Sequence, residues 1–299
     1  MPPTRLRTTI LLAITVVVLA TGGEWFLAAV YGEDEIACTQ TTLPTSLVEL
    51  PEASGLAASG RTPGLIWAIN DSGQPRLLAI DENGQTRGRV NIAQAQLTDW
   101  EDISISRCDG GACVYIGDIG DNDAHRSSVR LYRLPEPGAH EKTRQADGMD
   151  ARYPDGSHDA EAMFVLPDGR IFVITKSSPS VVYRTARFEP GASVTFERLM
   201  SLPLASVTDA EASPDGDWIA VRSNEEAAFY RTESLLRGDV EHATMVSLAE
   251  FTEPQGEGIT FGARGAVYLA GEGGGKGAPG TFLRLECSLP APTAAAQQP

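Results

Sequence analysis

Short apolar runs dominate the chain after residue 40, and most of them alternate with polar positions. They are bounded by turn-forming stretches such as Pro167-Asp168-Gly169 and Pro214-Asp215-Gly216. Alternation with a period of two is typical of β-strands, and clusters of Gly, Pro, Asp and Asn typically separate such strands. Helical periodicity is scarce, and only residues 233–237 form a modest helix candidate. The pattern therefore predicts an all-β protein.

One unit recurs along the chain at a spacing of about fifty residues. It opens on a signature in which acidic or polar residues precede an apolar strand, and further strands follow. The signatures are Glu52-Ala53-Ser54-Gly55-Leu56, Asp99-Trp100-Glu101-Asp102-Ile103, Asp159-Ala160-Glu161-Ala162-Met163, Asp209-Ala210-Glu211-Ala212-Ser213 and Gln255-Gly256-Glu257-Gly258-Ile259. Their third positions lie 47, 60, 50 and 46 residues apart. Such near-equal spacing indicates a repeat architecture.

Four-stranded units of this length are typical of the blades of a β-propeller. Residues 46–50 precede the first signature and supply the fourth strand that the last unit lacks, so an N-terminal strand is predicted to close the ring. We expect five blades, and a sixth would have to lie in the long stretch from Arg126 to His158. A β-sandwich, the rival fold, requires no equal spacing. The propeller is predicted to span residues 33–289, followed by a disordered tail at 290–299.

The N-terminal segment predicts export. Arg5 and Arg7 precede an uncharged run whose apolar core, residues 10–20, has the length of the hydrophobic region of a signal peptide. If Glu24 lies at the membrane interface, the apolar segment is long enough for a membrane anchor. Residues 1–32 are therefore predicted to be either a signal peptide or an N-terminal membrane anchor, and the rest of the chain is placed outside the cytoplasm.

Four cysteines in an exported chain favour disulfide bonds. Cys108 and Cys113 flank a turn-rich spacer, so we predict that they pair locally, which leaves Cys38 to pair with Cys287. The second bond would join the two ends of the patterned region. Free buried thiols are the alternative. Lipid attachment at Cys38 is disfavoured, because Glu35 occupies a position where an apolar residue is preferred.

The composition is strongly acidic. Among the 299 residues, 24 Lys and Arg face 40 Asp and Glu, which gives a formal net charge of −16, and 42% hydrophobic residues suffice for a buried core. We expect no nucleic-acid partner, because the chain has no basic stripe that could neutralise a phosphate backbone. So many carboxylates either merely repel other acidic molecules or hold cations.

The acidic signature positions are expected to meet. In a propeller, the loop before each innermost strand and the loop between the second and third strands open on the same face, so both sets of side chains converge on one end of the channel. The predicted metal ligands are Asp99, Glu101, Asp118, Asp121, Asp159, Glu161, Asp209, Glu211 and Glu257. Two carboxylates about 6 Å apart repel by roughly 3 kcal/mol at an effective dielectric near 20. Such a cluster therefore either keeps protons or binds positive charge.

Ca²⁺ is the predicted cofactor, because the candidate ligands are all oxygens and this cation takes about six to eight of them. The alternative is a solvated ring of acids that share protons and pair with Arg and Lys. Lys176 and Arg222 would offset part of the charge and are the candidate catalytic cations. His158 directly precedes Asp159 and is either a general base or a surface turn residue.

The Asp-x-Glu signatures, the Gly-Asp-Ile-Gly-Asp-Asn loop of residues 117–122 and the segment Glu253-Pro254-Gln255-Gly256-Glu257-Gly258-Ile259 resemble motifs of known proteins. These are calcium-dependent propellers of the phytase-like kind and, more loosely, gluconolactonase- and paraoxonase-like hydrolases. The resemblance covers about residues 46–289, although those relatives usually have six blades. The resemblance implies that four residues are axial metal ligands: Glu101, Glu161, Glu211 and Glu257. It implies two further ligands in the loop, Asp118 and Asp121.

Two functions fit these features. The first is an exported ligand-binding or scaffolding module of the cell envelope, in which Ca²⁺ holds the blades together. The second is a Ca²⁺-dependent hydrolase of esters, lactones or phosphoesters, in which an acidic side chain activates water and Lys176 and Arg222 stabilise negative charge. The sequence leaves open whether the protein is an enzyme. In either case we expect a monomer that contacts a small-molecule ligand or an envelope component, and a membrane only through its N-terminal segment.

Overall fold

The computed structural model describes residues 20–21, 24–25, 36–275 and 277–290. Two short strands, β1 (Ala20–Thr21) and β2 (Glu24–Trp25), pair with each other. The predicted signal peptide or anchor at 1–32 and the predicted tail at 290–299 otherwise lie outside the described residues and stay predictions. Within the described ranges, no helix is both long and apolar enough to cross a membrane.

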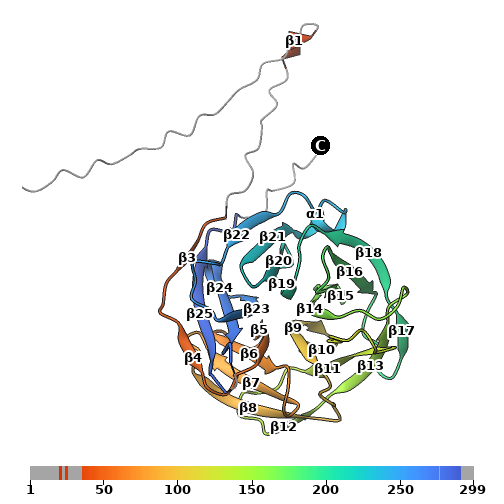
Figure 1. Ribbon diagram of the computed structural model, residues 1–299, viewed down its shortest axis with the longest axis vertical. Coiled ribbons are helices and arrows are strands. Elements are labelled where there is room, and N and C mark those ends of the chain that lie inside the picture. Colours follow the sequence, from red (N-terminus) through yellow and green to blue (C-terminus); the bar gives the residue numbers. More distant parts are fainter. Residues whose placement is uncertain (1–19, 22–23, 26–35, 276, 291–299) are drawn as a thin grey trace, which may run out of the picture. The chain divides into compact units, whose positions relative to one another are not determined.

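From Ile36 onward the chain forms five sheets arranged around a common axis (Figure 1). This confirms the predicted all-β, five-bladed propeller. In each blade the strands follow one another outward from the axis and pair antiparallel. Blade 1 contains β5 (Ala53–Ala58), β6 (Leu65–Asn70), β7 (Arg76–Asp81) and β8 (Thr86–Ala93); blade 2 contains β9 (Trp100–Cys108), β10 (Gly111–Asp118), β11 (Val129–Pro135) and β13 (Asp147–Arg152).

The remaining blades follow the same plan, and one short helix, α1 (Thr232–Leu236), lies where the sequence predicts it. Blade 3 contains β14 (Ala160–Val165), β15 (Ile171–Thr175), β16 (Ser180–Thr185) and β18 (Glu197–Leu202); blade 4 contains β19 (Val207–Ala212), β20 (Trp218–Ser223), β21 (Glu226–Arg231) and β22 (Thr244–Ser247); blade 5 contains β23 (Gln255–Phe261), β24 (Ala266–Glu272) and β25 (Gly280–Cys287). A 3₁₀ turn, η1 (Ala263–Gly265), joins the first two strands of blade 5.

Chain ends close the ring at blade 5. Strands β3 (Cys38–Gln40) and β4 (Thr45–Leu47) both pair antiparallel with β25. The disulfide bond Cys38–Cys287 joins the first strand to the last, and the second disulfide bond is Cys108–Cys113. Both predicted pairings are confirmed, and they fit an oxidising, extracytoplasmic compartment.

Two additional strands overlap neighbouring blades. Strand β12 (Thr143–Gln145) leaves the path of blade 2 and pairs parallel with β8 of blade 1. Strand β17 (Ser193–Thr195) leaves blade 3 and pairs parallel with β13 of blade 2. The long stretch from Arg126 to His158, the candidate for a sixth blade, therefore supplies β11 and β13 of blade 2 and the strand β12 at the outer edge of blade 1.

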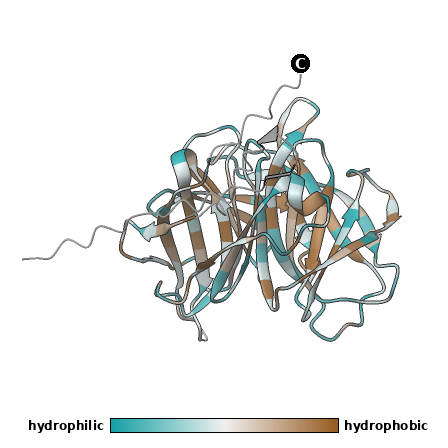
Figure 2. Cartoon of the chain, turned by 90° about the horizontal axis from the view of Figure 1, so that it is seen from above, coloured by the Kyte–Doolittle hydropathy of each residue, from teal (hydrophilic) through white to brown (hydrophobic). Residues whose placement is uncertain are grey.

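The core consists of five apolar clusters, one between each pair of adjacent blades. Between blades 1 and 2, for example, Trp67 packs in the same cluster as Trp100 and Tyr132. Each sheet thus has two apolar faces, and only a closed ring buries both faces of every blade. Figure 2 shows this distribution, with hydrophobic positions along the strands and hydrophilic ones concentrated in the loops.

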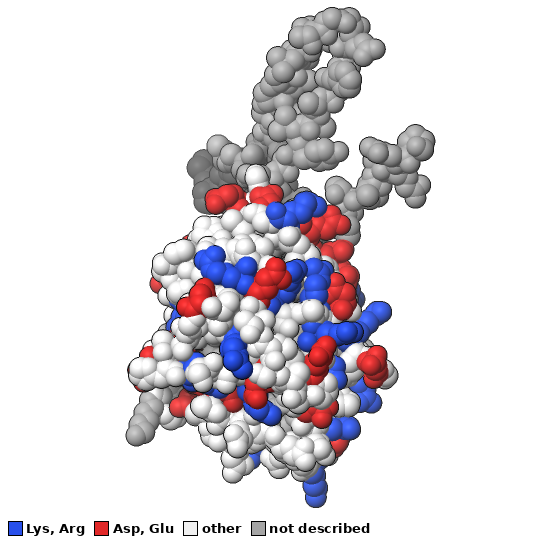
Figure 3. Space-filling model, turned by 90° about the vertical axis from the view of Figure 1, so that its right-hand side faces the viewer, with Lys and Arg blue, Asp and Glu red and all other residues white. Residues whose placement is uncertain are grey.

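Charged side chains are mixed on the outer surface. On the face shown in Figure 3, Lys and Arg are interspersed with Asp and Glu. Ion pairs among the described residues include Arg184 with Glu197 and Arg130 with Asp150. The face seen there has no continuous basic surface, in agreement with the prediction from the composition.

Candidate functional site: the carboxyl mouth and the channel

Every innermost strand contains a bulge close to its N-terminal end, where one or two of its residues have no partner on the second strand. In blades 1 and 4 the bulged side chain is a hydroxyl that donates to the carbonyl oxygen of the bulged residue in the next blade: Ser54 to Glu101, and Thr208 to Glu257. The equivalent bulge positions of blades 1 to 5 are Ser54, Glu101, Glu161, Thr208 and Glu257.

This register differs from the sequence repeat in blade 4. The sequence aligns Glu211 with the glutamates of blades 2, 3 and 5, whereas the structure puts Thr208 at that position. Glu211 follows three residues later, about 10 Å further along the strand, and Asp209 lies one residue beyond the bulge. The Asp-x-Glu motif of blade 4 is thus shifted inward along the strand, because the bulge, rather than the acidic motif, sets the register.

We call the channel end at the bulges the mouth. Its carboxyl groups include Asp99 and Glu101 of blade 2, which converge over Gly120: a β-carbon at Gly120 would lie 2.2 Å from Glu101 Oε1 and 2.5 Å from Asp99 Oδ2. Burial, followed by the charges of Glu161 and Asp99, raises the pKa of Glu101 to about 10. Burial and the Asp159 charge raise the pKa of Asp99, while a hydrogen bond with Glu101 opposes the shift. At neutral pH, Glu101 therefore holds a proton beside Asp99.

Lys176 supplies the positive charge at the mouth. Its Nζ donates to Glu161 Oε1 at 2.6 Å. Burial tends to lower the pKa of Lys176, but the hydrogen bond to Glu161 and the charges of Glu161, Glu257 and Asp159 outweigh it and raise the pKa. Burial raises the pKa of Glu161 despite this partner. Lys176 thus stays charged and neutralises one carboxylate.

Further acids add to the excess of negative charge. Burial raises the pKa of Glu257 to about 8, against the hydrogen bond that Gln255 donates at 2.7 Å. Burial and Glu52 raise the pKa of Asp71 to about 7, and Asp71 Oδ1 is buried without a hydrogen-bond partner. Burial and Glu52 also raise the pKa of Glu272. Carboxyl groups therefore far outnumber ammonium groups at the mouth.

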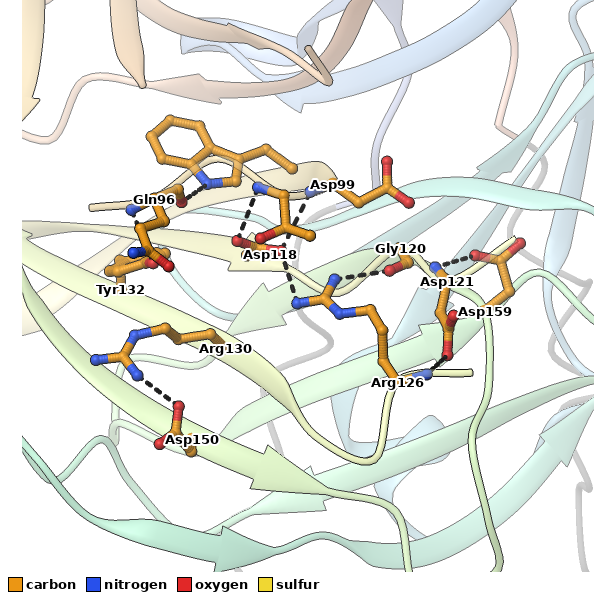
Figure 4. A network of polar contacts seen from close by, with 12 residues as sticks. Gln96, Asp99, Asp118, Gly120, Asp121, Arg126, Arg130, Tyr132, Asp150 and Asp159 are labelled. Carbon is orange, nitrogen blue, oxygen red and sulfur yellow. Dashed lines mark hydrogen bonds and ion pairs between the residues drawn. The ribbon is translucent and has the colours of Figure 1, made fainter. Parts of the chain in front are cut away.

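Asp118 and Asp121 have a different role from the predicted one of open ligands. Asp118 accepts hydrogen bonds from the backbone N–H groups of Thr98 and Asp99 and pairs with Arg126 at 2.8 Å (Figure 4). Asp121 accepts from the backbone N–H groups of His125 and Arg126, and its own N–H donates to Asp159 Oδ1 at 2.8 Å. Their oxygens hold the loop that positions Asp99 and Asp159.

Two candidate catalytic residues are already engaged with partners of their own. Arg222 is fully buried between blades 4 and 5, where it donates to the carbonyl oxygen of Gly258 at 2.9 Å and pairs with Glu253 at 3.1 Å. His158 Nε2 lies 3.0 Å from Asp155 Oδ1 and 2.9 Å from the hydroxyl of Tyr183. Arg222 therefore joins two blades, and His158 belongs to a polar cluster on blade 3.

Asp102 and Asp209, deeper in the channel, form a pair that the sequence reasoning missed as a unit. Both residues immediately follow a bulge, in blades 2 and 4, and they hydrogen-bond to each other. They also accept backbone N–H groups at equivalent positions, one from each innermost strand: Leu56, Ile103, Met163, Ala210 and Ile259. We call this pair the hub. Its signal in the sequence is that both residues fall within signatures, once blade 4 is aligned by its bulge.

Burial governs protonation in the hub. It raises the pKa of Asp102 well above its usual range, and the neighbouring charge of Asp209 adds to this effect. Burial raises the pKa of Asp209 to about 7, against the hydrogen bonds from Asp102 and Ile259. Below the hub, burial raises the pKa of Glu211 well above its usual range, while Ser104 donates to its Oε2 at 2.8 Å. The hub therefore carries at least one proton at neutral pH.

A metal site is not preassembled among the described residues: no group of three or more His, Cys, Asp or Glu there has the arrangement of a metal centre. The donor chemistry of the mouth nevertheless fits a hard cation, since it offers carboxylate oxygens together with the unpartnered Asp71 Oδ1. The hub carboxyls fit less well, because backbone N–H groups already bond to both oxygens of Asp102 and to Oδ2 of Asp209.

No protein-family model matches the chain. A search of curated proteins also finds no relative. Among solved structures, the PQQ-bound aldose sugar dehydrogenase from Streptomyces coelicolor aligns with a TM-score of 0.51 and 11% identity, covering 85% of this chain and 99% of that one. A gluconolactonase from Xanthomonas campestris aligns with a TM-score of 0.41 and 13% identity, over 74% of this chain and 68% of that one. The first likeness places the chain among β-propellers and extends to the fold alone.

Proposed function

We propose that this protein is an exported binding module whose mouth takes a divalent cation, Ca²⁺, and through it a small oxygen-rich ligand or an envelope component. The observation that carries the proposal is the imbalance of charge: the carboxyl groups of Asp71, Asp99, Glu101, Glu161 and Glu257 face the ammonium group of Lys176. The two disulfide bonds support the extracytoplasmic setting.

The physical argument is a competition between protons and a cation. Without a cation, the buried acids keep protons, as the raised pKa values of Glu101 and Glu257 indicate. A divalent cation would stabilise their ionised forms and displace those protons. Asp99 and Glu101 are the best placed to hold it, because they already converge over Gly120, and Glu161 would join them if Lys176 turns away.

Calorimetric Ca²⁺ titration of the disulfide-bonded protein at pH 7 tests this proposal. Titrations in two buffers of different ionisation enthalpy measure the protons released, and we expect at least one per Ca²⁺ bound. The double variant Glu101→Gln, Glu161→Gln should weaken binding at least about tenfold, since it removes two candidate ligands. The matched control is Glu197→Gln, on the outer strand of blade 3. Unchanged affinity in the double variant, or binding without proton release, would contradict the proposal.

A Ca²⁺-dependent hydrolase is the second candidate, and one observation favours it. An acid that holds its proton, Glu101, lies beside Asp99, and such a pair can supply both the acid and the base of a hydrolytic reaction. Lys176 could stabilise negative charge, whereas Arg222 is already committed to carbonyl oxygens and Glu253. Turnover of an ester, lactone and phosphoester panel that EDTA abolishes would favour the hydrolase, and Ca²⁺ binding without turnover favours the binding module.

A further inference from the structure

The opposite end of the channel contains a second region with the properties of a binding site. The innermost strands end there, and two cavities of about 610 and 620 Å³ open between them. They adjoin each other, since both are lined by Ala58, Ser59, Ser213, Pro214 and Phe261. Volumes of this size are in the range of small-molecule sites.

The 610 Å³ cavity, which we call the arginine cavity, combines an apolar wall with two guanidinium groups. Its apolar residues include Ile105, Pro167 and Phe261, and its cationic residues are Arg61 and Arg107. The disulfide bond Cys108–Cys113 closes the hairpin that carries Arg107, so this side chain starts from a fixed backbone position.

The two arginines lack the partners that most other arginines have. Most arginines of the described residues pair with a carboxylate, as the ion pairs of Arg87, Arg130 and Arg284 illustrate. Arg61 donates instead to the backbone carbonyl oxygen of Glu136, and Arg107 forms no ion pair with any other described residue. In a protein with a net charge of −16, unneutralised guanidinium groups beside a cavity favour an anionic ligand.

The acid within this cavity does not cancel that charge. Glu211 is its one carboxyl-bearing lining residue, against the two guanidinium groups. The Glu211 side chain also has a partner of its own, because Ser104 donates to its Oε2 at 2.8 Å. The carboxylate of Glu136 lies behind the wall, where Ser59 and Trp67 both donate to its Oε1.

The hub separates this cavity from the mouth. Asp102 and Asp209 occupy the channel between them and accept N–H groups from all five innermost strands. A ligand in the arginine cavity is therefore remote from the carboxylates of the mouth, and the two regions have opposite charge preferences.

We propose that the arginine cavity binds a small amphiphilic carboxylate, with the carboxylate group between Arg61 and Arg107 and the apolar body against Ile105, Pro167 and Phe261. The guanidinium groups can donate charge-assisted hydrogen bonds to the carboxylate. Glu211 is the one carboxyl group in the lining, and the two guanidinium groups outnumber it. This site is independent of Ca²⁺ at the mouth.

Octanoate and octan-1-ol are the probes that test this proposal, because they share an apolar chain and differ in the charged group. Calorimetric titration of the intact protein with EDTA present should give a saturable octanoate isotherm, with octan-1-ol weaker by about tenfold or more. Arg107→Gln should weaken octanoate binding by a similar factor while leaving octan-1-ol unaffected. The matched control is Arg264→Gln, since Arg264 lines the adjoining cavity alone.

Several results would overturn the proposal. These are equal affinity for the two probes, no octanoate binding up to millimolar concentration, unchanged affinity in Arg107→Gln, or loss of affinity in Arg264→Gln. Octanoate binding that requires Ca²⁺ would also overturn it, because that dependence assigns the ligand to the mouth. The Arg107 side chain is exposed and forms no ion pair within the described part of the chain, so the variant is expected to fold, and circular dichroism checks it. A failed Ca²⁺ titration leaves this test intact.

Discussion

The mouth and the hub use the same kind of side chain in opposite ways. In the hub, two carboxyl groups accept backbone N–H groups from all five innermost strands, and they stabilise the ring by doing so. At the mouth, Asp99 and Glu101 lie side by side, and Asp71 has an oxygen without a partner. The number of fixed donors around a buried carboxyl group, rather than its position in an acidic motif, therefore separates a structural acid from a candidate ligand.

The largest expected effect is a loss of stability when a hub carboxyl group is removed. Asp209→Ala leaves the N–H groups of Leu56 and Ile259 without an acceptor, and each such buried donor costs roughly 1–3 kcal/mol. We expect a loss of about 3 kcal/mol or more in the free energy of unfolding, measured by urea denaturation with the disulfide bonds intact. Asp209→Asn retains an acceptor oxygen and should cost less. Equal effects of the two substitutions would contradict the hub.

The pH dependence of the free energy of unfolding should show that the mouth acids hold protons in the folded chain. Folding raises the pKa of Asp71 to about 7 and that of Glu257 to about 8, so the folded chain holds more protons than the unfolded chain above their ordinary values of 3.8 and 4.5. Stability without metal should therefore fall as pH rises from about 4 to 8, by about 2 kcal/mol or more. Thermal unfolding with EDTA measures this decrease.

Calcium should reduce the same slope, because the bound cation replaces the protons at the mouth. The hub also contributes to the decrease, since folding raises the pKa of Asp209 to about 7, but backbone donors already bond to Oδ2 of Asp209 and to both oxygens of Asp102. The part of the slope that Ca²⁺ removes thus belongs to the mouth. If Ca²⁺ leaves the whole slope unchanged, the mouth acids are a solvated ring that shares protons.

The smallest expected effect concerns Glu211, which shares its motif with the mouth glutamates but lies beyond the hub. Glu211→Gln should change Ca²⁺ affinity by less than about twofold, whereas Glu161→Gln should weaken it by about tenfold, because an amide is a poorer ligand for the cation. The two substitutions make the same chemical change in the same motif. Similar losses in both variants would restore the register that the sequence repeat predicts.

Repeat spacing was sufficient to predict the propeller, since each blade must place an apolar strand at equivalent distances along the chain. The closure at β25 and both disulfide bonds followed from the missing fourth strand and from the ends of the pattern. Blade number could be counted because the extra length near residue 140 lacks a signature.

The roles of the side chains at the site were harder to predict from the sequence. The motif Asp209-Ala210-Glu211 reads like Asp159-Ala160-Glu161, yet a bulge at Thr208 shifts it inward, and a bulge has no distinct residue pattern here. The loop acid Asp118 looked like a ligand because its backbone donors and Arg126 are invisible in a repeat alignment. The partners of Arg222 and His158 could not be predicted for the same reason, since they come from other strands and loops.

The overlapping strands β12 and β17 have a mechanical consequence. Through parallel pairing they join the outer edges of blades 1, 2 and 3: β12 connects blade 2 to blade 1, and β17 connects blade 3 to blade 2. The disulfide bond Cys38–Cys287 links β3 to β25 where the ring closes. No parallel strand among the described ones joins blade 4 to blade 3 or blade 5 to blade 4. Under tension, we therefore expect the ring to open first beside blade 4, while blades 1, 2 and 3 stay joined.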